Sequence, residues 1–130
     1  MSQTIRPYTP DDSDKLFALL EREGEEWQAY WRGDNRAKYE KVIAECSVFG
    51  GFVGDELVGY VRVRDDGTGS MFIMDLLVDK SHRLTGYGKA LMAHVKAVFS
   101  DNDVYVLGAT EVYDFYEKCG YTEEGKVYKI

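Results

Sequence analysis

Apolar residues recur at helical spacing in four stretches of the chain, which are separated by extended or turn-like segments. Either of two neighbouring aspartates can cap the first of these predicted helices. The helices are expected from Asp11 or Asp12 to about Glu23, from Asn35 to Glu45, onward from Gly88, and from Glu111 to Lys118. The residues expected on the buried faces are Leu16, Leu19 and Leu20, then Tyr39, Val42 and Ile43, then Leu91, Val95 and Val98.

Other stretches show the alternation or the continuous apolar runs of β-strands. These stretches are residues 3–8, 47–53, 57–64, 70–78 and 104–107, with a last strand between 121 and 130 that begins near Lys126. Arg62 and Arg64 alternate with valines, as in a strand with one buried face. Residues 70–78 are apolar on both faces and are expected at the centre of a sheet. The elements follow the order β-α-α-β-β-β-α-β-α-β, which is an α/β arrangement.

The composition indicates one domain with an acidic surface. The chain has 130 residues, enough for a single packed core, so residues 1–130 are expected to form one domain. Acidic residues outnumber basic ones by 23 to 16, and the net charge of −7 argues against nucleic acid as a partner. The same excess favours a cationic substrate, although acidic surfaces also serve solubility.

Two further features concern the compartment. No basic leader precedes an apolar run, and no apolar run has the length of a membrane span, which predicts a cytoplasmic protein without a membrane partner. Cys46 and Cys119 are the two cysteines, and their spacing is not that of metal ligands. We therefore expect two free thiols in a reducing compartment and no bound metal.

The stretch with the clearest chemistry is Arg-Leu-Thr-Gly-Tyr-Gly-Lys at residues 83–89, directly before a predicted helix. Glycines let a backbone approach a ligand closely, and helix starts bind phosphates through their free N–H groups. The surrounding residues 80–89 are basic in an acidic chain. A dinucleotide-binding fingerprint would need glycine at position 91, where this chain has Leu91. A P-loop would need glycine at position 83 and Ser or Thr at position 90, where this chain has Arg83 and Ala90. A phosphorylated cofactor of another kind is indicated, the alternative being a loop that merely starts a helix.

Three motifs together resemble one family. The Arg-x-x-Gly-x-Gly run after a strand resembles the pyrophosphate loop of the GNAT superfamily of N-acetyltransferases, which bind acetyl-CoA. Residues 5–12 resemble the family's first strand and turn, and Phe-Tyr-Glu-Lys-Cys-Gly-Tyr at 115–121 resembles its Phe-Tyr-Glu-Lys-x-Gly-Phe signature. The resemblance spans nearly the whole chain and implies a mixed sheet with helices on both faces. The family often has Asn and Ala where this chain has Ala109 and Val112, and that Asn usually helps to hold the cofactor.

The resemblance also implies a cofactor site. The pantetheine arm would pair with the backbone of the fourth strand, and the pyrophosphate would rest on amides of the glycine loop, with Arg83 and Lys89 adding positive charge. The strand residues are Leu76, Leu77 and Val78, and the loop residues are Leu84, Thr85, Gly86, Tyr87, Gly88 and Lys89. Acetyl-CoA is therefore the expected co-substrate.

The catalytic residues are expected on the fourth strand and the last helix. Tyr116 occupies the position of the tyrosine that usually acts as the general acid in the family. Its alternative role is to pack on the cofactor. Asp75 is the one ionisable residue between Ser70 and Val78, and burying a charge without a partner is costly. It can be a general base or substrate ligand, or it can cap the region of the first two helices or pair with a nearby arginine. Glu111 is a weaker candidate for the base, because it is expected to cap its helix.

An aromatic segment between the first two helices falls where the family's acceptor pocket lies. Its proposed substrate-binding residues are Trp27, Tyr30 and Trp31. Aromatic faces beside Glu25 and Glu26 suit a cation, and the alternative is that the tryptophans close the core. The favoured function is transfer of acetyl from acetyl-CoA to a primary amine of a small molecule or peptide. A catalytically silent acyl-CoA-binding module and a dimerising interaction protein remain alternatives, and a homodimer is compatible with both.

Overall fold

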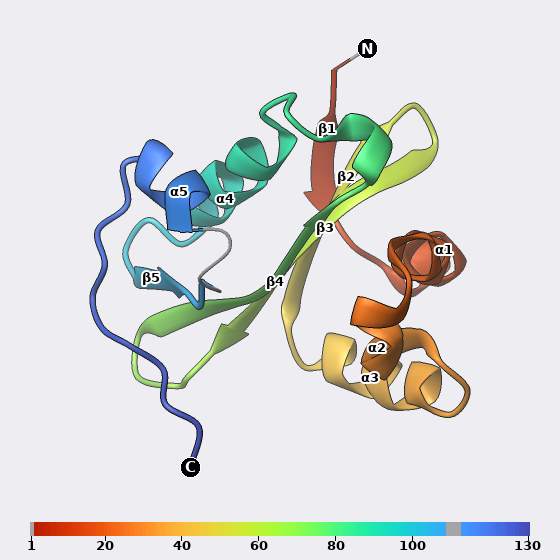
Figure 1. Ribbon diagram of the computed structural model, residues 1–130, viewed down its shortest axis with the longest axis horizontal. Coiled ribbons are helices and arrows are strands. Elements are labelled where there is room, and N and C mark those ends of the chain that lie inside the picture. The colour runs from red at the N-terminus through yellow and green to blue at the C-terminus, as the bar shows by residue number, and fades with distance from the viewer. Residues whose placement is uncertain (1, 109–112) are drawn as a thin grey trace.

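A five-stranded mixed sheet forms the centre of the protein (Figure 1). The structure, a computed structural model, describes residues 2–108 and 113–130. The strands are β1 (Thr4–Pro7), β2 (Ser47–Val53), β3 (Glu56–Asp65), β4 (Ser70–Val78) and β5 (Asp103–Val106), and they lie in that order across the sheet. The first four are antiparallel to their neighbours, and β5 runs parallel to β4. The mixed α/β sheet expected from the sequence is confirmed.

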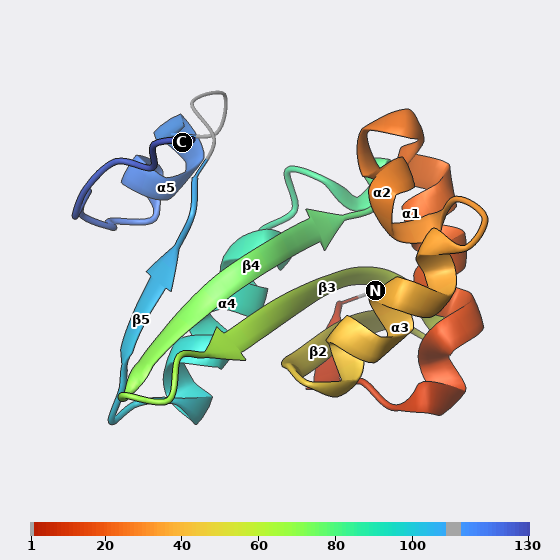
Figure 2. The same cartoon turned by 90° about the horizontal axis from the view of Figure 1, so that it is seen from below.

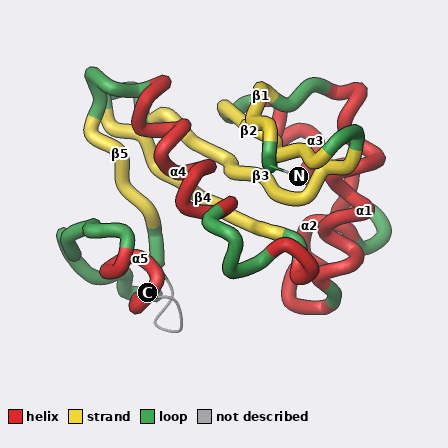
Figure 3. The backbone as a smooth tube through the Cα atoms, turned by 90° about the horizontal axis from the view of Figure 1, so that it is seen from above, coloured by secondary structure: helices red, strands yellow, loops and turns green. Residues whose placement is uncertain are grey.

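Helices cover both faces of this sheet (Figure 1, Figure 3). The elements α1 (Ser13–Glu23), α2 (Gln28–Trp31) and α3 (Asn35–Ala44) lie on one side, while α4 (Tyr87–Val98) and α5 (Tyr113–Lys118) lie on the other. Short 3₁₀ turns precede three of these helices, at Pro10–Asp12, Glu25–Trp27 and Lys80–His82. No helix in the described ranges combines the length and the apolar character that crossing a membrane requires.

Two hydrophobic clusters hold the layers together. The first packs α1 and α3 against one face of the sheet, with Leu16, Phe17, Leu19, Leu20, Tyr39, Ile43, Val48, Phe52, Leu57, Tyr60 and Leu77. The second packs α4 against the other face, with Phe49, Val61, Val63, Met71, Ile73, Leu91, Met92 and Val95. The apolar periodicity therefore predicted most of the helical core correctly. Val42 and Val98 are exceptions, since they are 40% and 49% exposed.

A bulge in β4 decides which side chains face which cluster. Arg62 of β3 pairs with Asp75, but the next residue, Val63, pairs with Ile73, so Met74 is an extra residue in β4. Simple alternation would put Ile73 and Asp75 on the same face. The extra residue instead leaves Ile73 on the α4 side and turns Asp75 towards α2 and α3.

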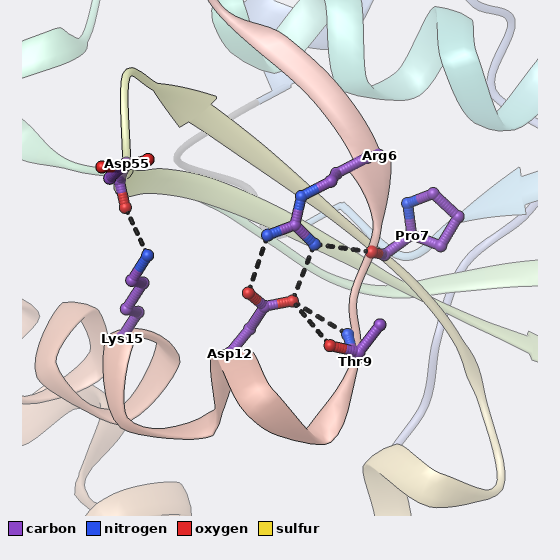
Figure 4. Close-up of polar contacts among 6 residues, drawn as sticks. All are labelled: Arg6, Pro7, Thr9, Asp12, Lys15 and Asp55. Atoms are coloured by element: carbon purple, nitrogen blue, oxygen red, sulfur yellow. Dashed lines mark hydrogen bonds and ion pairs between the residues drawn. The ribbon is translucent and has the colours of Figure 1, made fainter.

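The junction between β1 and α1 is fixed by a buried carboxylate (Figure 4). Asp12 accepts two bonds from the Arg6 guanidinium, at 2.8 and 2.9 Å, and a third from the backbone N–H of Thr9 at 2.9 Å. These donors lower the pKa of Asp12 from 3.8 to about 2, with the Arg6 hydrogen bond as the largest cause. Nearby, the Lys15 ammonium donates to the backbone carbonyl of Asp55 at 2.6 Å, joining α1 to the β2–β3 turn. Asp12 was one of two aspartates predicted to cap the first helix. Its side chain makes no capping hydrogen bond to α1 and takes part instead in capping the 3₁₀ turn Pro10–Asp12.

Two predictions about strands were wrong. The strand predicted near Lys126 does not form, since residues 121–130 lie outside helices and strands, and all of them are exposed. Among the described residues the segment has no strand partner, and strand propensity alone does not order a segment. Arg62 was expected on an open face of β3 but is only 7% exposed, because Asp75 lies opposite it in β4.

Candidate active site

The sheet opens where β4 and β5 separate (Figure 2). Their parallel pairing runs from Ser70–Asp103 to Ile73–Val106 and then stops. Beyond the Met74 bulge, residues 75–78 of β4 pair with β3 on one side only, as far as the described strands show. This open backbone edge includes Leu76, Leu77 and Val78, the residues expected to receive a pantetheine arm.

The chain after β4 is fastened to the end of α1 by two ion pairs. Asp79 accepts two bonds from the Arg22 guanidinium, at 3.0 and 3.2 Å. Arg83 bonds the carboxylate of Glu23 and donates from its Nε to the carbonyl of Val78 at 3.0 Å. The Glu23 side chain is only 7% exposed. The structure thus directs Arg83 towards α1, whereas the sequence had suggested it for a phosphate.

The glycine loop itself has unusual backbone conformations. Gly86 lies in the left-handed region, with φ of 83°, and a Cβ built on it would have nothing within 4 Å. Leu84 is also left-handed, with φ of 62°, and its side chain is fully exposed. A leucine in this conformation is strained, and such strain concentrates at ligand sites. The Thr85 hydroxyl donates to the carbonyl of His82 within the loop.

The start of α4 follows this loop, and its Gly88 lies beside the side chains of Leu76 and Val78 in the open half of β4. The first helical bond runs from the Ala90 N–H to the Gly86 carbonyl at 3.0 Å, so the amides before Ala90 precede the helical ladder. A Cβ on Gly88 would lie 3.6 Å from Val78 and 3.4 Å from Phe115 of α5. Lys89 is exposed in this turn, and no described residue forms an ion pair with it. Open space, helix amides and a lysine together suit a phosphate group.

Tyr116 of α5 lies half-buried beside the end of β5. Its ring presses on Gly108, where a Cβ would lie 2.7 Å from the Tyr116 Cε2 atom. Burial raises the pKa of the Tyr116 hydroxyl, and proximity to Cys119 raises it further, so the hydroxyl keeps its proton at neutral pH. A protonated hydroxyl can act as a proton donor.

Asp75 sits at the centre of a buried polar network. Its Oδ2 accepts from the Tyr39 hydroxyl at 2.6 Å and from the Arg62 Nε at 2.5 Å, and its Oδ1 accepts from the Tyr30 hydroxyl at 2.7 Å. The Tyr60 hydroxyl lies 2.9 Å from that of Tyr39. The pairing with an arginine is one of the alternatives that the sequence left open for Asp75.

This network also holds the tyrosines in place and in one protonation state. The rings of Tyr30 and Tyr39 stack with centroids 4.0 Å apart. Burial and the Asp75 carboxylate raise the pKa of both hydroxyls, which therefore stay protonated and donate. The Asp75 carboxylate raises the pKa of Arg62 against the effect of burial, which keeps the guanidinium charged. Asp75 and Arg62 thus form a fully hydrogen-bonded ion pair.

A cavity of about 260 Å³ opens onto this network. It is lined by Glu26, Trp27, Ala29, Tyr30 and Asp75. Trp27 and Tyr30 therefore lie where the sequence predicted an acceptor pocket. Trp31 does not line the cavity: its indole N–H donates to the Gly24 carbonyl at 3.1 Å, and its ring packs against the first hydrophobic cluster.

Sequence reasoning missed two residues of this site and left others unresolved. Tyr39 was predicted only as an apolar core residue, and Arg62 as an exposed one, although both bind Asp75. A buried aspartate needs donors, and an arginine on the neighbouring strand was the available signal. Ala109, Glu111 and Val112 lie outside the described residues. Within the described ranges, no three His, Cys, Asp or Glu side chains are grouped as metal ligands would be.

The open strand edge, the glycine loop and the half-buried tyrosine together are those of an acyltransferase that uses a CoA thioester. The model of the Acetyltransferase (GNAT) family matches residues 12–121, and the chain belongs to this family. Members of the family use acetyl-CoA, and the chain is accordingly an acyltransferase. A search of curated proteins found no match.

Solved structures share the fold at low sequence identity. A GNAT-family acetyltransferase from Streptococcus pneumoniae is 21% identical, with 98% of each chain covered and a TM-score of 0.76. An aminoglycoside acetyltransferase from an uncultured soil metagenomic sample is 23% identical, with 100% of this chain and 98% of that chain covered and a TM-score of 0.76. The PaiA N-acetyltransferase from Thermoplasma acidophilum, solved with coenzyme A, is 21% identical, with 95% and 92% covered and a TM-score of 0.75. At these identities the likeness establishes the fold.

Proposed function

We propose that the chain, acting as one domain in the cytoplasm, transfers the acetyl group of acetyl-CoA to a primary amine of a small molecule or peptide. The proposal rests on one observation: β4 borders both the proposed cofactor site and the cavity proposed for the acceptor. Its open edge at residues 76–78 faces the start of α4, while Asp75, the residue before, lines the cavity under α2. A thioester held on that edge would lie next to an acceptor in the cavity. The relatives that are an aminoglycoside acetyltransferase and an N-acetyltransferase are consistent with an amine acceptor.

The residues at the glycine loop fit a CoA pyrophosphate. Gly86 leaves open space, the helical ladder begins only at the Ala90 amide, and Lys89 supplies positive charge. Acetyl-CoA would supply an activated acetyl group at this site. Arg83 would contribute by fastening the loop to Glu23 and would not bind the phosphates itself. If Arg83 moved to the phosphates, the buried Glu23 carboxylate would be left without its ion-pair partner.

The proposed chemistry is a direct transfer. The neutral acceptor nitrogen forms a bond to the acetyl carbon while the bond from that carbon to sulfur breaks. The nitrogen loses one proton to solvent, and the sulfur receives one from the Tyr116 hydroxyl, which solvent then reprotonates. Tyr116 is suited to this step because its hydroxyl is protonated and no described residue accepts a bond from it.

Asp75 is proposed to orient the acceptor pocket. Three donors bind its carboxylate, which ties Asp75 to Tyr30, Tyr39 and Arg62. It holds the Tyr30 hydroxyl, whose oxygen keeps a lone pair that can accept a bond from the acceptor nitrogen. Asp75→Asn should therefore raise the acceptor KM and leave the shape of the pH–rate profile unchanged. A flattened acid limb of that profile would instead assign Asp75 as the general base.

The proposal is tested by binding and turnover together. Acetyl-CoA at ~100 times its Kd should stabilise the protein by about 2.7 kcal/mol, which a thermal melt detects. Gly86→Val should abolish this shift, since valine fills the open space and is strained at a positive φ. A screen of amines for thiol release then separates the enzyme from a silent binding module. Binding without release for every amine would support the module, and the absence of any shift would refute both functions.

A further inference from the structure

The charges that line the acceptor cavity are unevenly distributed. At its floor, the negative charge of Asp75 is balanced by Arg62 at 2.5 Å, and both side chains are more than nine-tenths buried. The floor therefore offers hydrogen-bonding groups but almost no net charge. A neutral amine is the form of the acceptor that reacts, and such a floor suits it because it does not hold a bound amine in its protonated form.

The rim of the cavity is different. Glu26 lines it, is exposed, and forms no ion pair within the ranges that the structure describes. The ring of Trp27 stands beside it, packed against Tyr30 with centroids 5.7 Å apart. A free carboxylate next to aromatic faces is a favourable environment for a cation.

An amine bound at the rim is thus favoured in its protonated form, and an amine bound at the floor in its neutral form. A carboxylate near the reacting nitrogen would stabilise its ammonium form and slow the transfer. A carboxylate at the rim is useful to the reaction only if it holds a second cationic group, which stays charged while the other nitrogen reacts at the floor. Building on the function proposed above, we infer that Glu26 selects acceptors that carry a second positive charge, the simplest being straight-chain diamines.

The test compares matched acceptors and matched variants. Each acceptor pair consists of a straight-chain diamine and the alkylamine in which a methyl group replaces the second ammonium. The wild type should show a KM for the best diamine about tenfold below that for its alkylamine, the sum expected of an exposed ion pair and one cation–π contact. Glu26→Gln should raise the diamine KM more than the alkylamine KM and reduce the preference to the roughly threefold share of the cation–π contact. Glu25→Gln is the control, because Glu25 is the neighbouring exposed carboxylate and does not line the cavity.

Binding is measured as well as turnover, so that failure of the proposed reaction can be distinguished from failure of the proposed charge selection. Trp27 lines the cavity, so its fluorescence can report diamine binding without any reaction. Diamine binding that depends on Glu26, without acetylation of any amine, would refute the proposed reaction and support the charge selection. Equal KM values for diamine and alkylamine would overturn the inference while the reaction stands. The same reduction in Glu25→Gln, or an undiminished preference in Glu26→Gln, would also overturn it.

Discussion

The buried Asp12 carboxylate gives the protein a stability that depends on pH, and Asp12→Asn should remove it. Its pKa of about 2, against 3.8 when free, means that folding favours the charged form. The difference corresponds to about 2 kcal/mol of stability at neutral pH. Because the folded-state pKa is the lower one, this contribution is complete above roughly pH 5 and is lost as the pH falls towards 2. At about pH 3 it should have fallen to roughly half.

Urea unfolding at a series of pH values measures this effect. Asp12→Asn should be less stable than the wild type by about 2 kcal/mol at pH 7, and the difference should shrink as the pH is lowered. Asp11→Asn is the matched control, since Asp11 is exposed in the same turn and makes no described hydrogen bond. A deficit in Asp12→Asn that is the same at both ends of the pH range would show that its cause is lost packing. An equal deficit in Asp11→Asn would refute the role of the Arg6 pair.

Three further predictions concern the site. Tyr116→Phe should lower kcat by ~100-fold with little change in the KM for acetyl-CoA, as steady-state kinetics would show; wild-type turnover would refute the acid role. Gly108→Ala places a methyl group within 2.7 Å of the Tyr116 ring and should lower kcat by about tenfold. This loss should vanish in the Tyr116→Phe background, and a full loss there would mean that Gly108 acts otherwise. Arg83→Gln leaves the Glu23 carboxylate without its ion partner and should cost about 2 kcal/mol in urea unfolding, allowing for the solvent exposure of Arg83. Adding Glu23→Gln should restore part of that stability, and no restoration would contradict the pairing.

The sequence predicted the parts of the fold that local periodicity controls. The helices containing Leu16 and Leu91 were placed correctly because a stripe of apolar residues at helical spacing has one stable arrangement against a sheet. The last strand, near Lys126, was predicted by the same kind of reasoning and does not form. Residues with strand propensity show that a segment can be a strand, but pairing also requires a partner edge, which lies elsewhere in the chain.

The candidate site also contains one part that the sequence predicted and one part that it did not. The glycine loop at 83–89 is contiguous, so its motif could be found by inspection. The network around Asp75 gathers side chains from α2, α3 and β3, and the Met74 bulge decides which face Asp75 occupies. Met74 is an ordinary strand residue, and nothing in its identity marks it as an insertion. For that reason the partners Tyr39 and Arg62 were not predicted.

The two ion pairs at the end of α1 also bear on how a new acceptor preference could be engineered. Arg22 and Glu23 fasten the helix end to the loop after β4, and the segment that forms the cavity rim starts directly afterwards, at Gly24. On the far side, α3 starts at Asn35, and its next residue, Arg36, pairs with Asp14 of α1 at 2.7 Å. Residues 24–34 therefore form a cassette between two anchored ends. If the proposed acceptor pocket is correct, swapping that cassette for another, with both anchors kept, would change what the pocket admits while the glycine loop keeps its attachment to α1.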